Sequence, residues 1–432
     1  MPFAAEYELL RQAVVHRSGE CAVSASRLNV DWNVVLWLGR REDALLFLRE
    51  AMSHGALPAA CPDEIRGQLD DLNAVAKLQA LDRTAVVCRL SDALAREGIP
   101  FFLADDWMFQ SCFHPERTLI ETKAAIRCLV RASDQGRAQA ALSAAGLPSA
   151  TAQCQVAARQ QTPVECLTTL AAGEDIDALF SSAVGNAMHL TMAGRSLRRL
   201  GADVWLRHLA TPWAGRRRIS LLSAWQIARL AELTGPQPVS VEQVVAASRA
   251  ILNPAGNGSE FYQAETFPPA SSPAPVSFFP APFVPTPAPV VERMLALAQV
   301  QANDVVFDLG CGEGSIVIEA ASRFGARAIG IDCDPGLLAT AAARAASAGV
   351  ADRVTFERGD LFSADVRAAT VICLYLAPAL YAPVRERVLR SAKPGTRIVS
   401  CDYFFPAWPP SRAAFVRAGP ASISQIYLWQ MP

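Results

Sequence analysis

The chain has 432 residues, of which 51% are hydrophobic and 19% are charged, and its formal net charge at pH 7 is −1. This length exceeds the size at which one hydrophobic core stops growing, so we expect two domains. No stretch reaches the roughly 18 uninterrupted apolar residues that a membrane helix needs, so we predict no membrane span. The near-neutral total gives no support to a nucleic-acid partner.

The first 20 residues mix acidic and basic side chains without a continuous apolar stretch, so we predict no signal peptide and a cytoplasmic protein. The 11 cysteines are scattered from Cys21 to Cys401, and no two of them form a C-x-x-C pair. An odd number without zinc-like spacing predicts reduced thiols and no metal site.

A proline-rich stretch divides the chain. Ten of the 29 prolines lie between Pro254 and Pro289, together with Ser and Gly and without an apolar period. Such a composition is typical of a semi-rigid, partly extended linker. We therefore predict an N-terminal domain over residues 1–250, a linker over residues 251–282 and a C-terminal domain over residues 283–432.

The N-terminal domain has a mainly helical pattern. Apolar residues recur at three-to-four spacing in three segments, residues 44–53, 62–80 and 83–97. Two short apolar runs, residues 99–104 and 126–130, are β-like, and after Leu170 the helical pattern returns through Met188 and Trp205. We expect an α+β domain in which helices frame a small sheet.

The C-terminal domain shows strands in alternation with helices. Strands are predicted at residues 305–309, 328–331, 354–357, 370–375, 396–400, 413–417 and 422–430. A helix over residues 290–300 precedes the first strand, and a glycine turn, residues 310–314, joins that strand to a helix over residues 315–324. Seven strands in this order predict a doubly wound, Rossmann-like α/β sheet whose last two strands form an antiparallel pair.

Each of the first three strands is followed by an acid. Asp308 stands at the end of the first strand, Asp332 follows 24 residues later at the end of the second, and Asp360 comes just after the third. A glycine turn lets the backbone approach a ligand and directs a helix N-terminus at it. An acid at the end of the second strand can accept both ribose hydroxyls of a nucleoside. These features predict a nucleoside-binding site at the carboxyl edge of the sheet.

The spacing of three motifs makes the assignment more specific. D-L-G-C-G-E-G at residues 308–314, G-I-D-C-D-P at residues 330–335 and G-D-L-F at residues 359–362 resemble the successive motifs of class I S-adenosylmethionine-dependent methyltransferases. The resemblance implies S-adenosyl-L-methionine as cofactor. It also implies the following cofactor-binding residues: Asp308 at the amino group, Gly310, Cys311 and Gly312 along the methionine moiety, Asp332 at the ribose, Asp360 and Leu361 at the adenine, and Gly314 and Cys333 beside them.

Segments outside these motifs resemble one subgroup of this methyltransferase class in particular. Residues 283–300, 400–403 and 426–429 are similar to a compact subgroup that contains the lysine methyltransferases of the ATP synthase c subunit and of the adenine nucleotide carrier. The chain departs from this subgroup at Glu313 and Ser315, where Asp and Arg are frequent. The resemblance implies that the acceptor is a protein or peptide amine, while a small-molecule acceptor stays open.

Catalysis of methyl transfer to an amine also requires that the amine lose a proton. All five histidines precede the linker, so a base in the C-terminal domain is a carboxylate, a tyrosine or water. Asp402 and Tyr375, at predicted strand ends, are the catalytic candidates, and the alternative for each is a hydrogen-bonded strand-end residue. Residues 376–378, Leu-Ala-Pro, lack the motif of enzymes that methylate nucleobase amines, so we expect no nucleic-acid substrate.

The N-terminal domain resembles a bacterial family of nucleotidyltransferases in residues 30–32 and 94–103. In that family a strand carries an Asp-x-Asp pair, and such acids hold Mg²⁺ against a triphosphate. Here residues 125–127 read Ala-Ile-Arg, so the resemblance implies a degenerate domain that recognises a substrate or partner. Asp105 and Asp106 are the nearest carboxylates that could replace the missing pair.

Three functions therefore stand as alternatives. The first is methyl transfer with acceptor recognition by the N-terminal domain. The second is a non-catalytic scaffold or regulatory protein in which the degenerate domain binds a partner, and the third is active nucleotidyl transfer. A basic cluster, residues 216–218, close in sequence to Trp213 and Trp225, could bind an anion, although a solvated loop is the simpler interpretation.

Overall fold

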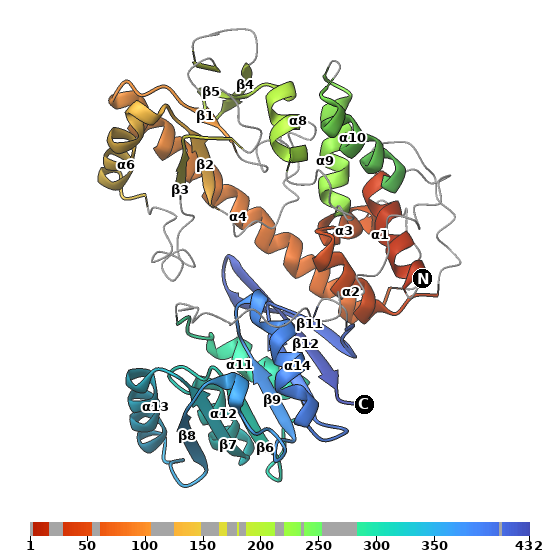
Figure 1. The fold of residues 1–432 in the computed structure, drawn as a ribbon, viewed down its shortest axis with the longest axis vertical. Coiled ribbons are helices and arrows are strands. Elements are labelled where there is room, and N and C mark those ends of the chain that lie inside the picture. Colours follow the sequence, from red (N-terminus) through yellow and green to blue (C-terminus); the bar gives the residue numbers. More distant parts are fainter. Residues whose placement is uncertain are drawn as a thin grey trace. The chain divides into compact units, whose positions relative to one another are not determined.

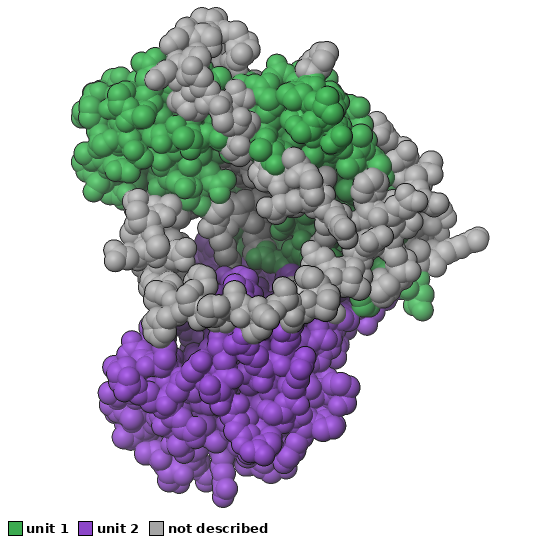
Figure 2. Space-filling view, viewed as in Figure 1, with its two compact units in different colours: residues 1–29, 38–263 green, residues 30–37, 264–432 purple. Residues whose placement is uncertain are grey.

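The structure, a computed structural model, describes residues 3–16, 29–53, 61–104, 125–147, 164–170, 179–180, 187–211, 220–234, 237–252, 283–405 and 408–432. The chain forms two compact units (Figure 2). The N-terminal unit comprises residues 1–29 and 38–263, and the C-terminal unit comprises residues 30–37 and 264–432. The predicted sites at Asp105, Asp106 and residues 216–218, and nearly all of the predicted linker, lie outside the described residues.

The C-terminal unit is a seven-stranded sheet with helices on its faces (Figure 1). Its elements are α11 (Ala288–Leu297), β6 (Val305–Leu309), α12 (Ser315–Phe324), β7 (Arg327–Asp332), α13 (Pro335–Ser347), β8 (Val354–Arg358), η7 (Leu361–Ser363), β9 (Val371–Leu374), η8 (Pro378–Leu380), α14 (Tyr381–Arg387), η9 (Leu389–Ser391), β10 (Arg397–Cys401), β11 (Arg412–Gly419) and β12 (Ser422–Gln430).

The strand order is β11-β12-β10-β9-β6-β7-β8. The five strands from β10 to β8 run parallel, and β12 and β11 complete the sheet as an antiparallel pair. All seven predicted strands are present and the Rossmann-like α/β prediction is confirmed. Parallel pairing brings the carboxyl ends of β6, β7, β8 and β9 to one edge, where such sheets bind ligands.

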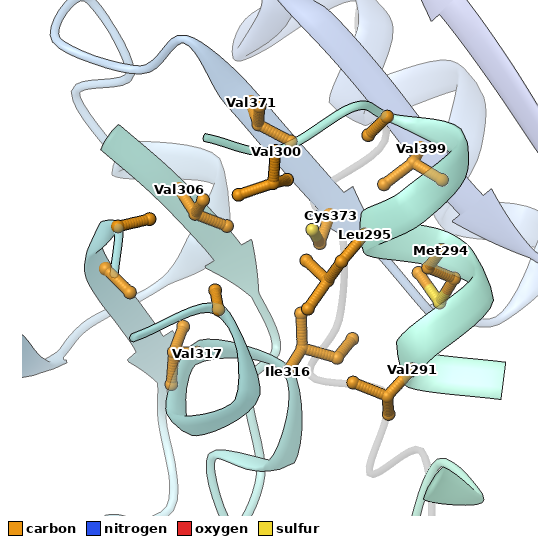
Figure 3. Packing of buried hydrophobic residues seen from close by; sticks show 14 of the residues in the cluster. Val291, Met294, Leu295, Val300, Val306, Ile316, Val317, Val371, Cys373 and Val399 are labelled. Carbon is orange, nitrogen blue, oxygen red and sulfur yellow. The ribbon is translucent and has the colours of Figure 1, made fainter. Parts of the chain in front are cut away.

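One face of this sheet is closed by α11 and α12 (Figure 3). The helices contribute Val291, Met294, Leu295, Ile316 and Val317, and the sheet contributes Val306, Val371, Cys373 and Val399. All are buried, and each large apolar side chain removed from water in this way contributes roughly 1.5–3 kcal/mol. The predicted helix over residues 290–300 is present but starts at Ala288, because Pro287 and Pro289 suit a helix start.

At the opposite edge, buried Asp304 links the starts of three parallel strands. Its carboxylate accepts hydrogen bonds from the Thr370 hydroxyl at 2.7 Å, from the Gln301 amide at 2.7 Å and from the Arg397 guanidinium. Thr370 precedes β9 and Arg397 begins β10, and the Thr370 hydroxyl also accepts the Val305 amide of β6 at 2.9 Å. These bonds set the register in which the three strands reach the carboxyl edge.

A segment from the amino-terminal part of the chain completes the C-terminal unit. Residues 30–37 include the first turns of α2 (Trp32–Arg41). The Asn33 side chain accepts the amide of Ala413 in β11 at 3.1 Å, and the Gln425 side chain of β12 donates to the Leu36 carbonyl at 3.4 Å. The Trp37 ring, 1% exposed, lies edge-on to Phe404 with centroids 6.2 Å apart.

The N-terminal unit contains a five-stranded sheet of order β3-β2-β1-β5-β4 (Figure 1). With the rest of α2, its elements are α1 (Ala4–His16), α3 (Leu45–Ser53), α4 (Asp63–Arg96), β1 (Phe102–Leu103), β2 (Ile126–Leu129), η2 (Ala132–Asp134), α6 (Gln135–Ala144), β3 (Val164–Leu167), β4 (Ala187–Met192), β5 (Arg195–Leu200), α8 (Ala202–Ala210), α9 (Leu221–Ala231) and α10 (Val239–Leu252).

The predicted helical segments 62–80 and 83–97 are confirmed, and they are continuous in one helix, α4, because Leu81 and Asp82 between them are compatible with helix. The helical interpretation at Met188 was wrong, since Met188 lies in β4, which pairs with β5 through a hairpin at Ala193 and Gly194. Among the described helices, none combines the length and the apolar character that crossing a bilayer requires.

We expect Trp37→Ala to weaken the C-terminal unit by about 3–5 kcal/mol, because it leaves a cavity beside Phe404. Hydrogen exchange of the β11 and β12 amides in the full chain measures this unit by itself. Trp32→Ala on the same helix is the matched control, and since Trp32 is only half-buried its loss should be smaller. Equal losses for the two variants would contradict the role assigned to Trp37.

Candidate functional site

The glycine turn after β6 is held against the end of β7. The amides of Gly310 and Cys311 both donate to the Ile331 carbonyl, at 2.8 and 3.0 Å. Gly310, Gly312 and Gly314 all have positive φ, at 83°, 52° and 76°. Only glycine adopts these angles without strain, so the three glycines define the path of the turn.

The same glycines leave no room for a side chain. A Cβ on Gly310 would lie 2.9 Å from the Leu376 side chain, and one on Gly314 would lie 2.9 Å from the Phe356 ring. A Cβ on Gly312 would lie 2.2 Å from the ring of Phe283, which therefore covers the turn. The turn is packed from three directions and leaves its backbone as the surface that a ligand can approach.

Asp332 joins the turn to the end of β7. One carboxylate oxygen accepts the Gly312 amide at 2.8 Å, and the other accepts the Asp334 amide at 3.0 Å. Each oxygen has a second lone pair that these bonds do not use. Asp334 in turn caps α13 by accepting the amides of Gly336 and Leu337, at 2.7 and 3.2 Å. The carboxylate is thus fixed in place and still able to accept two hydroxyls.

Asp308 is a buried acid at the end of β6, 3% exposed. Burial, and after it the nearby Asp332 carboxylate, raises the pKa of Asp308 to about 7. Among the described residues, none donates a hydrogen bond to its carboxylate. A buried carboxylate in this condition is suited to a cationic group brought by a ligand.

The remaining predicted cofactor residues lie at the same edge. Asp360 precedes η7 and caps it by accepting the Phe362 amide at 3.0 Å, with Leu361 beside it. Cys311 is buried, and burial raises the pKa of its thiol. The Cys311 sulfur lies over Gly330 of β7, in the space that a side chain at that position would fill. Cys333 is exposed in the turn after Asp332.

The two predicted catalytic residues follow β9 and β10. Asp402 is 8% exposed, and its carboxylate accepts the Gln425 amide at 3.1 Å and the Ser424 hydroxyl at 3.4 Å. This arrangement fits the alternative interpretation, a hydrogen-bonded strand-end residue, better than a free base. Tyr375 is half-buried, and its ring lies nearly parallel to that of Tyr403 with centroids 6.4 Å apart.

Two residues at this edge were not singled out from the sequence. Phe283 covers Gly312 although it belongs to the end of the proline-rich stretch, and its position at the start of the segment 283–300 was the available signal. Tyr403 stands directly after Asp402, but nothing in its spacing distinguishes it from the half-buried Phe404 and the buried Phe405 that follow.

Comparison with known proteins identifies the C-terminal unit. The family described as the ANTKMT methyltransferase domain matches residues 308–412. A protein-lysine N-methyltransferase of Saccharolobus islandicus (strain REY15A) is 36% identical over 139 residues, which cover 32% of this chain and 86% of that protein. The chain belongs to the S-adenosylmethionine-dependent methyltransferases.

Other methyltransferases are similar over the same region. The adenine nucleotide translocase lysine N-methyltransferase of Mus musculus is 32% identical over 130 residues, 30% of this chain and 56% of that protein. A crystal structure of an RNA methyltransferase from Salinibacter ruber, in complex with S-adenosyl-L-homocysteine, is 46% identical and covers 34% of this chain and 94% of that one, with a TM-score of 0.33. The cofactor of this methyltransferase is S-adenosylmethionine.

The geometry of the site fits this cofactor. S-adenosylmethionine carries an ammonium group, a ribose with two hydroxyls and an adenine. The site offers a buried carboxylate without a donor, a fixed carboxylate with free lone pairs and an exposed acid, in the order Asp308, Asp332 and Asp360 along one sheet edge. Among the described residues, no group of three or more His, Cys, Asp and Glu is arranged to hold a metal ion.

Gly312→Ala should abolish measurable cofactor binding, because the new Cβ has to displace Phe283 and the residue is held at positive φ. Calorimetric titration of the full chain with S-adenosylmethionine measures this. Gly349→Ala is the matched control, since Gly349 also has positive φ, at 70°, but has no atom within 4 Å of the added Cβ. Loss of binding in both variants would show that backbone strain alone, not the packing of the turn, is responsible.

Cofactor binding should depend on pH through Asp308. The carboxylate attracts an ammonium only when ionised, so with a pKa of about 7 affinity should fall about tenfold for each pH unit below 7. Above pH of about 8 the α-amino group of the ligand loses its own charge, so affinity should peak between these values. Asp308→Asn should bind weakly and lose the acidic limb of the profile in calorimetric titrations from pH 5.5 to 9. An unchanged acidic limb in that variant would exclude Asp308 as the titrating group.

Proposed function

We propose that this methyltransferase transfers a methyl group to a side-chain amine of a protein, with lysine as the methylated residue. The observation that carries the proposal is the similarity to two enzymes named as lysine methyltransferases, one of them matched over 86% of its length. Residues 376–378, Leu-Ala-Pro, also lack the motif typical of nucleobase-amine methyltransferases.

In this proposal the three acids and the glycine turn hold the cofactor. Asp308 binds the ammonium of the methionine moiety, and the backbone of residues 310–312 lies along that moiety. Asp332 accepts the ribose hydroxyls with the lone pairs left free by the Gly312 and Asp334 amides. Asp360 and Leu361 border the adenine. Gly314 and Cys333 lie beside the cofactor through their backbones.

The cofactor supplies an electrophilic methyl group on a sulfonium sulfur. The neutral amine of the substrate attacks that carbon in line with the C–S bond, a new N–C bond forms, and the electron pair of the C–S bond stays on sulfur, which leaves a thioether. Such a displacement depends mainly on alignment, so the chain acts by holding the two reactants in register.

The proton of the substrate amine has to leave before attack, because a lysine ammonium has a pKa near about 10.4. Residues 283–432 contain no histidine, and the Asp402 carboxylate is occupied by Gln425 and Ser424. We therefore propose that the proton is lost to water and that Asp402 positions the turn after β10. We propose that Tyr375 forms part of the acceptor site.

We further propose that residues 1–250 recognise the acceptor and that residues 251–282 connect the two domains. At the position of the Asp-x-Asp pair of nucleotidyltransferases, Arg127 in β2 forms an ion pair with Glu165 of the neighbouring strand β3 at 3.2 Å. A cation in an ion pair is unsuited to holding Mg²⁺. This supports a recognition role over nucleotidyl transfer, and membership of the methyltransferase family argues against a purely non-catalytic scaffold.

Labelling of a host lysate with tritiated-methyl S-adenosylmethionine tests the acceptor class. With the full chain we expect label in the protein fraction, and methylated lysine after acid hydrolysis. Asp332→Ala should reduce labelling to background because it removes the ribose contact, whereas Asp352→Ala, on an exposed loop before β8, should label like the wild type. Label confined to RNA or to small molecules would refute a protein acceptor while leaving the methyltransferase assignment intact.

A further inference from the structure

The chain makes an unusual tight turn directly after β10. Asp402 has φ of 61°, and the Tyr403 amide donates to the Cys401 carbonyl at 2.7 Å, which closes a three-residue turn around Asp402. A γ-turn with positive φ at a residue other than glycine is rare and strained. Strain of this kind persists only where the surroundings hold it, and it is concentrated at functional sites.

The surroundings of this turn hold it from both sides. The Asp402 amide donates to the Gln425 carbonyl at 2.7 Å, while the Asp402 carboxylate accepts the Gln425 amide and the Ser424 hydroxyl. The Ser400 hydroxyl donates to the Tyr403 carbonyl at 2.6 Å. The side chain predicted as a base therefore binds β12 and fixes the turn.

The turn leaves the Tyr403 side chain more exposed than the two aromatic residues that follow it in the sequence. Phe405 is 1% exposed, and the Phe404 ring packs against Tyr427 at 5.4 Å between centroids. Tyr403, immediately before them, is 38% exposed, and its ring lies 6.4 Å from those of both Tyr375 and Tyr381. A large aromatic side chain held in a strained turn and left accessible is not explained by packing alone.

The exposed ring lies at the edge of the sheet that binds the cofactor. Leu374, the residue before Tyr375, is in register with Leu309 of β6 and with Ser400 of β10. Leu376, the residue after Tyr375, contacts the glycine turn at Gly310. The Tyr375 and Tyr403 pair therefore stands beside the part of the turn assigned to the methionine moiety, the end of the cofactor that carries the methyl group.

We propose that Tyr403, together with Tyr375, forms an aromatic wall of the acceptor site that binds the ammonium and methylammonium forms of the target side chain, and that the turn at Asp402 positions it. An aromatic face attracts a cation through its quadrupole, and quaternary ammonium groups are bound in this way. The inference rests on the proposed amine acceptor. It implies that the wall holds the partly methylated side chain for a further transfer.

Two probes test the wall in the full chain. The first is equilibrium binding of Nα-acetyl-Nε-trimethyl-lysine amide in the presence of S-adenosyl-L-homocysteine, followed by NMR titration. The second is methylation of poly-L-lysine with labelled cofactor, which yields KM and kcat separately. We expect Tyr403→Ala to weaken binding of the first probe and to raise KM for the second, each about tenfold, with a smaller change in kcat and none in cofactor affinity.

Two matched variants identify the cause. Tyr403→Phe keeps the ring and should remain within about threefold of the wild type, whereas Tyr403→Leu keeps apolar bulk without a ring and should behave like Tyr403→Ala. The inference is overturned if the wild type does not bind the trimethyl-lysine probe, if Leu substitutes as well as Phe, or if Phe is as impaired as Ala.

The outcomes also separate this inference from the proposed function. Ring-dependent binding of the trimethyl-lysine probe without methylation of poly-L-lysine or of any lysate protein would support the aromatic wall and count against the amine acceptor. Methylation of lysine with a KM insensitive to Tyr403 would support the acceptor and reject the wall.

Discussion

The buried carboxylate of Asp304 sets the constraint on which the site depends. It accepts hydrogen bonds from Thr370 and Arg397, which stand at the starts of β9 and β10, and Thr370 also binds the first amide of β6. A slip of one residue in any of these strands would turn its side chains to the other face. Because the strand register is fixed at this edge, the strands also end together at the carboxyl edge. The acids, the glycine turn and the tyrosines that follow the strands therefore lie beside one another there.

At that edge the electrostatics is arranged for a ligand that brings positive charge. Asp308 and Asp332 lie close enough to raise the pKa of Asp308, and burial raises it more. Asp332 is compensated by the Gly312 and Asp334 amides, whereas no described residue donates to Asp308. The pKa of Asp308 therefore lies near neutral pH, and a bound cation would favour the ionised form of its carboxylate.

Much of the C-terminal unit could be predicted from the sequence, because its signals are local. The parallel strands β6, β7, β8 and β10 each end at or directly before an acid or a glycine, and Pro335 and Gly349 mark the two ends of α13. In the N-terminal unit the signals were weaker. β3 and β5 carry Glu165, Arg195, Arg198 and Arg199, so their polar positions hide the alternation of a strand, and the long helix α4 continues through Gly67 and through the apolar-pattern gap at residues 81–82.

The features that escaped prediction are the ones made by distant contacts. The positive φ of Asp402 depends on Gln425, the cover over Gly312 depends on Phe283, and the docking of residues 30–37 depends on β11 and β12. Each joins parts of the chain whose spacing carries no periodic signal. The roles assigned to the cofactor residues, and the resemblance of residues 1–250 to nucleotidyltransferases, stay predictions.

The attachment of residues 30–37 to β11 and β12 has a consequence for biosynthesis. Asn33 and its partner Ala413 are separated by 380 residues, and a ribosome that adds about 5–20 residues per second needs on the order of 20–80 s to make that length. Until β11 has been synthesised, the first turns of α2 lack these hydrogen bonds, and until residue 404 has been synthesised Trp37 lacks its contact with the Phe404 ring. The C-terminal unit can therefore be completed only after both of these distant segments have left the ribosome.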